Sequence, residues 1–170
     1  MEKDCYKRIS KIDYYLDIAK QVAERSTCLR KKYGTVIVNH DEIIATGYCG
    51  APRGRANCID LGYCTKKKIL PDLRHGGYDA CRSVHSEQNA IISAARKDMM
   101  GATLYLVGYR FDTGEYEKGA MPCQMCRKLI INAGIEKVIV RDLSEPKGYK
   151  EVMVEEWIQN DDLLEGKITY

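Results

Sequence analysis

The fold is decided by a stretch that begins with the apolar run Ala102-Thr103-Leu104-Tyr105-Leu106-Val107, which has the length of a buried strand. Residues 122–133 follow as a helix, and Pro122 suits its first position because the N–H that proline lacks would be unpaired there. Gly134 suits a left-handed cap at the end of this helix, and residues 135–140 form a second apolar strand pattern. Together these segments predict a right-handed βαβ unit with parallel strands.

The segments before this unit add a helix and a hairpin. Residues 12–23 carry apolar side chains at helical spacing after a capping-box sequence, and this helix should end near residues 26–28. Residues 33–38 and 43–48 have the composition of two hairpin strands. His40 falls at the turn between them, where we expect a solvated side chain rather than a metal ligand.

The end of the chain adds one more strand and one more helix. Val152 and Val154 alternate with polar residues after Tyr149, which indicates a last strand, and a terminal helix is expected to run to about Leu164. We therefore predict a single α/β domain over residues 1–170, with a C-terminal strand and helix extension at about 148–165. Helices on both faces of a mixed sheet make this a three-layer α/β/α fold.

A metal-binding pattern lies where two of the predicted helices begin. His85-Ser86-Glu87 falls in the first turn of a helix expected over residues 84–97, and Pro122-Cys123-Gln124-Met125-Cys126 opens the helix of the βαβ unit. His85, Cys123 and Cys126 supply three ligands and leave a tetrahedral zinc ion one open position for water. A structural zinc site is the alternative, but such sites usually have four protein ligands and no neighbouring Glu.

These residues predict a hydrolytic reaction at an amino-substituted ring. A zinc ion with this ligand set can lower the pKa of a water molecule from about 16 toward about 7, which yields a nucleophile at neutral pH. Attack on an amino-substituted pyrimidine or purine carbon would then expel ammonia. Glu87 is the candidate catalytic residue, because it is not needed as a ligand and can carry protons from the water to the ring and to the leaving amine.

The bulk composition excludes several other classes of protein. The net charge of the 170 residues is only +3, whereas a protein that binds nucleic acid duplexes usually has a dominant basic face. No run approaches the roughly 18 apolar residues of a membrane span, and the charged N-terminus is unlike a secretory signal. We therefore expect a cytoplasmic protein whose eight cysteines are thiols and metal ligands. A small anionic substrate fits this charge.

The long segment from Cys49 to about Asp79 lacks periodicity and is rich in glycine and basic residues. We interpret the run Lys66-Lys67-Lys68 within it as a solvated face. A second, structural zinc ion could bind in and just after this segment, through Cys58, Cys64, Cys81 and His75. The alternative is that these cysteines pack as small buried thiols.

Several runs of the chain resemble the cytidine/deoxycytidylate deaminase superfamily, and in particular the deoxycytidylate (dCMP) deaminases. The resemblance covers roughly residues 12–140, which form the expected core of the domain, and it is carried by residues 33–38, 45–54, 81–90, 101–105, 122–126 and 130–135. It implies a five-stranded mixed sheet between helices, zinc bound by His85, Cys123 and Cys126, and proton transfer by Glu87. It also implies the conversion of dCMP to dUMP, a homo-oligomer, and dCTP and dTTP as effectors.

The chain departs from the pattern of this superfamily on the substrate side. Cys49 stands where the superfamily usually has an Asn that contacts the sugar hydroxyl, and Ser86 stands where Ala is usual. The backbone N–H of Ser86 is implied to hold the base carbonyl. The Tyr-Arg pair that many dCMP deaminases use on the phosphate is absent after residue 140. Arg30, Arg53 and Lys150 are therefore the candidate phosphate ligands.

Cys49 also keeps two other hypotheses open. A thiol cannot replace an amide that both donates and accepts hydrogen bonds, so the substrate could be another amino-substituted base, such as a free base, a nucleoside or a modified cytosine. The third hypothesis is a zinc-stabilised binding module without catalysis, against which the presence of Glu87 argues.

Overall fold

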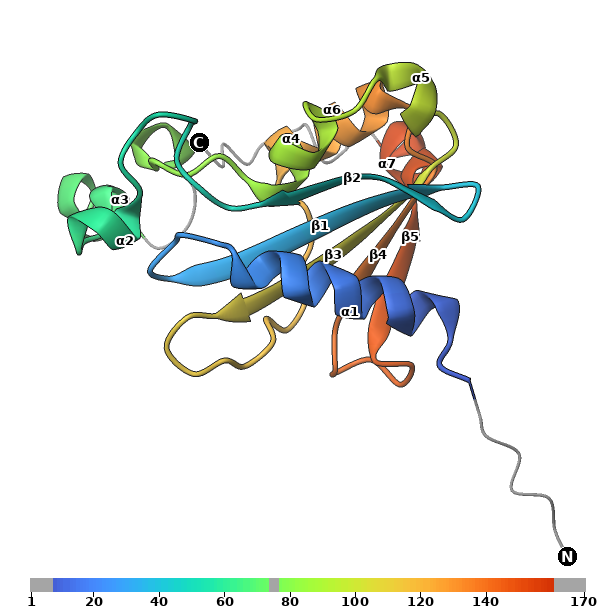
Figure 1. Ribbon diagram of the computed structural model, residues 1–170, viewed down its shortest axis with the longest axis horizontal. Helices are drawn as coiled ribbons and strands as arrows, with labels where there is room; N and C mark the ends of the chain where they lie inside the picture. The colour runs from blue at the N-terminus through green and yellow to red at the C-terminus, as the bar shows by residue number, and fades with distance from the viewer. Residues whose placement is uncertain (1–7, 74–76, 161–170) are drawn as a thin grey trace, which may run out of the picture.

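A computed structural model describes residues 8–73 and 77–160, and these residues are built around one five-stranded sheet (Figure 1). The strands stand in the order β2-β1-β3-β4-β5; their bounds are Lys31–Asn39 (β1), Glu42–Tyr48 (β2), Thr103–Arg110 (β3), Lys137–Arg141 (β4) and Tyr149–Met153 (β5). β3 and β4 are parallel, and the other neighbouring pairs are antiparallel. The sheet is therefore mixed, and its parallel pair is the one predicted from the βαβ sequence pattern.

Helices cover both faces of the sheet, as the three-layer prediction requires (Figure 1). Helix α1 (Lys11–Glu24) packs Leu16 and Ala19 against one face, whereas α4 (Ser86–Ile91), α5 (Arg96–Met99), α6 (Gln124–Ala133) and α7 (Val154–Gln159) lie on the other. Each face of the sheet has its own hydrophobic core, and successive residues of β1 belong to different ones. Val36 packs with α1, and Ile37 packs with Ile130 of α6. No helix of the described ranges is both long enough and apolar enough to cross a membrane.

Two glycines set how closely the helices approach the sheet. A Cβ atom on Gly34 of β1 would lie 2.1 Å from the carbonyl oxygen of Ala19 in α1. A Cβ atom on Gly47 of β2 would lie 2.2 Å from the carbonyl oxygen of Ser86 and 2.4 Å from the nitrogen of Ala90, both in α4. The backbone of each helix therefore rests directly on a strand, and Gly47 fixes the height of the α4 N-terminus above the sheet.

Two predicted helix bounds were wrong. The helix expected over residues 84–97 is two short helices: the backbone N–H groups of Ser93 and Ala94 bond to carbonyls three residues back, and the backbone of Ala95 is extended before α5 begins. Pro122 is not the first residue of its helix. Cys123 is the N-cap, with an extended backbone, and Pro122 lies just before it.

The remaining elements lie close to their predicted positions. His40 is exposed, and both His40 and Asp41 have positive φ, as expected for a tight hairpin turn. The aperiodic segment after Cys49 contains two short helices, α2 (Cys58–Leu61) and α3 (Thr65–Ile69), and a 3-10 turn, η1 (Tyr78–Ala80). The predicted C-terminal strand and helix are β5 and α7, and the part of that helix expected beyond residue 160 lies outside the described residues.

Candidate functional site

The N-termini of α4 and α6 bring the predicted metal ligands together. His85 is the N-cap of α4, and its backbone N–H donates to the side chain of Gln88 (3.1 Å). Cys123 is the N-cap of α6, and Cys126 lies in the first turn of that helix. The guanidinium of Arg127 donates to the carbonyl of Pro122 (3.0 Å), which fixes the chain as it enters α6. The three side chains thus come from two rigid helix starts on one face of the sheet.

The spacing of these three side chains fits a tetrahedral zinc ion. Nδ1 of His85 lies 3.4 Å from Sγ of Cys123 and 3.5 Å from Sγ of Cys126. Ordinary zinc–nitrogen and zinc–sulfur bonds at a tetrahedral angle place these atoms about 3.5–3.6 Å apart. Among the residues that the structure describes, this is the one group of three His, Cys, Asp or Glu side chains with such spacing. The donor set and the geometry therefore both suit zinc.

The protonation of the two thiols is set by their contact with each other. A hydrogen bond from Cys126 lowers the pKa of Cys123 to about 4, against the opposing effect of burial, and His85 lowers it further. The same hydrogen bond, together with burial, raises the pKa of Cys126. For His85, burial lowers the pKa, but the hydrogen bond with Cys123 and the charge of Glu87 outweigh it. Cys123 is thus the member of this group whose pKa is shifted toward the thiolate, the form that binds a metal ion.

Glu87 lies beside this group and is almost completely buried, with 4% of its surface exposed. Burial raises the pKa of its carboxyl group, and this effect outweighs the opposing charge of His85. The hydroxyl of Ser86 donates to Oε2 of Glu87 (3.0 Å). A buried carboxyl group whose pKa is shifted upward accepts a proton more readily than an exposed one, as a proton carrier must.

A cavity of about 190 Å³ opens beside the metal-binding group. His85, Glu87 and Cys123 form part of its wall, together with Tyr33, Cys49 and Met121. The ring of Tyr78 also lines it and meets the ring of His85 edge to face, with the ring centres 4.7 Å apart. The cavity therefore combines aromatic rings and apolar side chains with one buried carboxyl group, which suits a planar polar ring.

Comparisons with known proteins agree with this geometry. Residues 9–142 match the family model described as the cytidine and deoxycytidylate deaminase zinc-binding region. The chain belongs to this family. A deoxycytidylate deaminase of Mycobacterium phage D29 is 37% identical over 131 residues, which are 75% of this chain and 91% of the phage protein. Family membership confirms the predicted fold class and the enzyme class, a zinc-binding deaminase.

Two further relatives bear on the length and on the fold. A deoxycytidylate deaminase of Schizosaccharomyces pombe is 33% identical over 127 residues, or 74% of this chain, but the match spans only 35% of the yeast protein. The solved structure of the dCMP deaminase from the cyanophage S-TIM5, in complex with dCMP and dUMP, matches with a TM-score of 0.54 and 25% identity. That match covers 79% of this chain and 85% of the cyanophage chain.

Positively charged side chains also line the cavity, and the sequence-based prediction was wrong for one of them. Arg30, Lys31 and Lys66 line it. Lys66 was interpreted as part of a solvated face, yet it is 6% exposed and its ammonium lies 5.2 Å from the centre of the Tyr78 ring. Successive residues of a helix point in different directions. Lys66 of the short helix α3 is therefore buried, whereas Lys67 and Lys68 are exposed.

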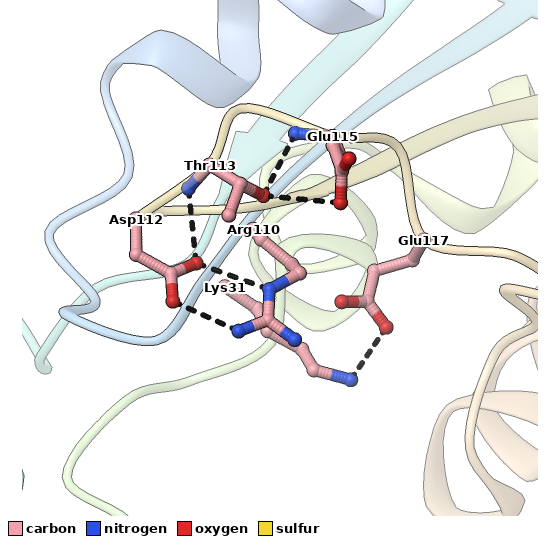
Figure 2. A network of polar contacts seen from close by, with 6 residues as sticks. All are labelled: Lys31, Arg110, Asp112, Thr113, Glu115 and Glu117. Carbon is pink, nitrogen blue, oxygen red and sulfur yellow. Dashed lines mark hydrogen bonds and ion pairs between the residues drawn. The ribbon is translucent and has the colours of Figure 1, made fainter.

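Lys31 has its charge engaged by the loop that follows β3. Its ammonium lies 2.6 Å from Oε2 of Glu117, and Figure 2 shows this pair beside the forked contact of Arg110 with Asp112. Thr113 continues the network toward Asp112, which stiffens the loop that leads to α6. Within residues 8–73 and 77–160, Arg30 makes no ion pair. Arg30 is therefore the cavity cation with the least engaged charge.

The structure separates the predicted substrate-binding residues into two groups. Cys49 and Arg30 line the cavity, and Ser86 lies against Glu87. Arg53 is exposed in a turn, and Lys150 is exposed on β5 at the edge of the sheet; neither lines the cavity. Burial raises the pKa of the Cys49 thiol, and the backbone of Ser86, whose N–H the resemblance assigns to the base carbonyl, opposes this rise.

Several cavity residues were missed from the sequence. Tyr78 and Cys28 belong to no motif, and nothing in their neighbourhood marks them. Cys28 lines the same cavity as Cys58, Cys64 and Cys81, three of the four residues considered for a second zinc ion. In the described part of the chain their sulfurs do not reach the spacing found at His85. His75, the fourth, lies outside the described residues.

Proposed function

We propose that the protein catalyses the zinc-dependent hydrolytic deamination of a cytosine nucleotide, converting dCMP to dUMP with release of ammonia. One observation carries this proposal: Glu87 is buried beside the group formed by His85, Cys123 and Cys126, at the wall of a cavity. The names of the relatives support the choice of substrate, since the phage D29 and yeast proteins are deoxycytidylate deaminases and the cyanophage enzyme was solved with dCMP and dUMP.

The protein side chains supply the proton transfers of this reaction. A bound zinc ion would provide a Lewis acid that lowers the pKa of water. Glu87 accepts a proton from the attacking water and passes it to the ring nitrogen as the C–O bond forms at the amino-bearing carbon. It then takes the second proton from the newly added hydroxyl group and delivers it to the amino group; the C=O bond of the product forms, the C–N bond breaks, and ammonia leaves. Both transfers need a carboxyl group that gains and loses a proton readily, in keeping with the raised pKa of Glu87.

We infer that Arg30, with Lys66 near it, recognises the substrate phosphate. Arg30 is the better candidate because Glu117 engages the charge of Lys31, whereas Arg30 makes no ion pair among the described residues. A charged hydrogen bond of this kind contributes about 1.5–3 kcal/mol, or roughly ten- to a hundredfold in kcat/KM. Arg30→Met should therefore reduce kcat/KM for dCMP by that factor and leave deoxycytidine unaffected. Arg53→Met is the matched control and should change neither.

The proposed reaction is tested by incubating the zinc-loaded protein with dCMP, dCTP, deoxycytidine and CMP, and measuring ammonia and uracil products. We expect dCMP to be turned over best. Glu87→Gln should retain zinc and lose at least about a hundredfold in kcat, the lower end of the range for general acid–base catalysis. No turnover of any of the four compounds would contradict the proposal and favour a zinc-stabilised binding module.

Cys49 favours a second candidate function, the deamination of a different amino-substituted base. Its thiol is fully buried at the cavity, and burial raises its pKa, so it remains a neutral, weakly hydrogen-bonding group. If dCMP is a poor substrate and Cys49→Asn improves it, the natural substrate differs at the sugar. If Cys49→Asn lowers the turnover of dCMP, the thiol belongs to the recognition of that nucleotide.

The other predictions made from the sequence remain proposals. A second zinc ion would use Cys58, Cys64, Cys81 and His75, as predicted from the sequence, and Cys28 is a further candidate because it lines the same cavity as the three cysteines. Metal analysis separates the cases, since two zinc ions per chain support this site and one excludes it. A homo-oligomer, dCTP and dTTP as effectors, and a cytoplasmic location are retained from the sequence; mass measurement with and without dCTP tests the first two.

A further inference from the structure

Three buried side chains form a hydrogen-bonded row that ends at Glu87. The hydroxyl of Thr35 donates to Oγ of Ser86 (2.8 Å), and Oγ of Ser86 donates to Oε2 of Glu87 (3.0 Å). Thr35 and Ser86 have no exposed surface, and Glu87 is 4% exposed. A polar row in such a position is costly unless every member is paired, so its presence in the core calls for an explanation.

The direction of the row follows from the acceptor at its end. Oε2 of Glu87 accepts from the Ser86 hydroxyl, so the single hydrogen of Ser86 is used in that bond. The oxygen of Ser86 then accepts from Thr35, and the described structure shows no other side-chain partner for the Thr35 hydroxyl. Each hydroxyl therefore has one orientation, and together they point at one oxygen of Glu87.

The sheet holds this row in place. Thr35 lies opposite Gly47 in the pairing of β1 with β2. Because Gly47 has no side chain, the first turn of α4 rests on the sheet there, and a Cβ atom on Gly47 would lie 2.2 Å from the Ser86 carbonyl. This close approach brings the side chain of Ser86 within hydrogen-bonding distance of Thr35. The row is thus anchored to the middle of the sheet rather than to a loop.

We propose that Ser86 and Thr35 are positioning residues that hold the carboxyl group of Glu87 in one orientation for proton transfer. The proposal rests on the proposed function, because it assigns Glu87 the transfers described above. The Glu side chain has three rotatable bonds, and a fixed hydrogen bond to one oxygen restricts the last of them. Proton transfer requires heavy-atom distances of about 2.6–3.2 Å, so a carboxyl group that rotates freely spends less time in a productive position.

The test measures kcat and KM for dCMP, with zinc content, in a series of variants. Ser86→Ala should lower kcat about tenfold and change KM less than twofold, because the substrate still binds while Glu87 is poorly oriented. Thr35→Val removes only the hydroxyl and should lower kcat about threefold, whereas Thr35→Ser should retain the activity. The double variant should match Ser86→Ala, since Thr35 acts only through Ser86. Thr46→Val, on the exposed side of β2, is the control.

A crystal structure of each zinc-loaded variant gives a readout that does not depend on activity. We expect the carboxyl group of Glu87 to be displaced or disordered in Ser86→Ala and unchanged in Thr46→Val. An unchanged kcat in Ser86→Ala, a double variant whose loss is the product of the single losses, or an unmoved Glu87 overturns the proposal. Failure of the parent protein to turn over any cytosine compound, with Glu87 displaced in Ser86→Ala, would instead refute the proposed function and leave the positioning role intact.

Discussion

Gly47→Ala tests whether the sheet sets the position of the active-site helix. The added Cβ atom would lie 2.2 Å from the Ser86 carbonyl oxygen and 2.4 Å from the Ala90 nitrogen. Ordinary contacts between such atoms are longer than about 3.2 Å, and a close-packed core cannot absorb the overlap. Because both contacts are to helix backbone, no side chain can move aside, and the N-terminus of α4 must retreat by about 1 Å.

The size of the effect on Gly47→Ala follows from this displacement. Overpacking of this kind costs about 1–3 kcal/mol of stability. The retreat carries His85 and Glu87 with it, while Cys123 and Cys126 stay on α6. A misplacement of about 1 Å can cost roughly a hundredfold in rate. We therefore expect kcat for dCMP to fall about a hundredfold, in a protein that is less stable but still folded at 25 °C.

Gly34→Ala is the matched control, because it creates the same overlap on the opposite face. Its Cβ atom would lie 2.1 Å from the carbonyl oxygen of Ala19 and 2.4 Å from the nitrogen of Ala23, so α1 must move instead of α4. Urea unfolding should show a similar loss of stability for Gly34→Ala and Gly47→Ala, whereas only Gly47→Ala should lose activity per bound zinc. Equal losses of kcat in the two variants, or full activity in Gly47→Ala, would refute the reasoning.

Three further predictions concern stability. Removing the metal with a chelator should abolish activity and lower the melting temperature by about 5–10 °C if zinc had been present at about a hundred times its dissociation constant; added zinc should restore both. Ser86→Ala alone leaves the buried Thr35 hydroxyl without its acceptor and should lower the free energy of unfolding in urea by about 1–3 kcal/mol. The Thr35→Val/Ser86→Ala double variant should recover most of that stability. The Ser144 hydroxyl, which donates to Asp142 at 2.6 Å, lowers the pKa of that carboxyl group, so its contribution is present above the unfolded value of about 3.9 and is lost as the pH falls through the lower folded value. The urea concentration at the unfolding midpoint should therefore decrease as the pH is lowered below about 4. Asp142→Asn should make this decrease smaller.

The parts of the fold that the sequence revealed are those where local pattern and global packing agree. The βαβ unit was predictable because an apolar strand, a capped helix and a second apolar strand follow each other closely. The metal ligands were predictable because both ligand groups occupy the first residues of helices, where spacing along the chain determines spacing in the fold. The break after α4 was not predictable from periodicity, because the apolar spacing continues to Ala95 while the backbone there is extended.

The substrate side of the site was harder to predict, because its residues come from segments without periodicity. Nothing in the run Lys66-Lys67-Lys68 shows which lysine turns inward, since that depends on the direction in which the short helix α3 lies. Thr35 did carry a signal, because a polar residue in the middle of an apolar strand pattern must find a partner in the core. The pairing of that residue with Ser86 could be known only once β1 and α4 were placed together.

The metal-binding residues and the substrate-side residues of the site are therefore held by different parts of the fold. This difference affects how the substrate specificity can change. His85 and Glu87 sit at the start of α4, which rests on the sheet at Gly47, and Cys123 and Cys126 sit at the start of α6, so the geometry of this group is coupled to the core. Arg30, Cys49 and Lys66 come instead from the ends of strands and from short helices between them. Substitutions in that second group can alter which ring or sugar is accepted without disturbing the residues that move protons. Because Cys49 belongs to it and lines the cavity, its replacement should change substrate preference while zinc content stays close to that of the parent protein.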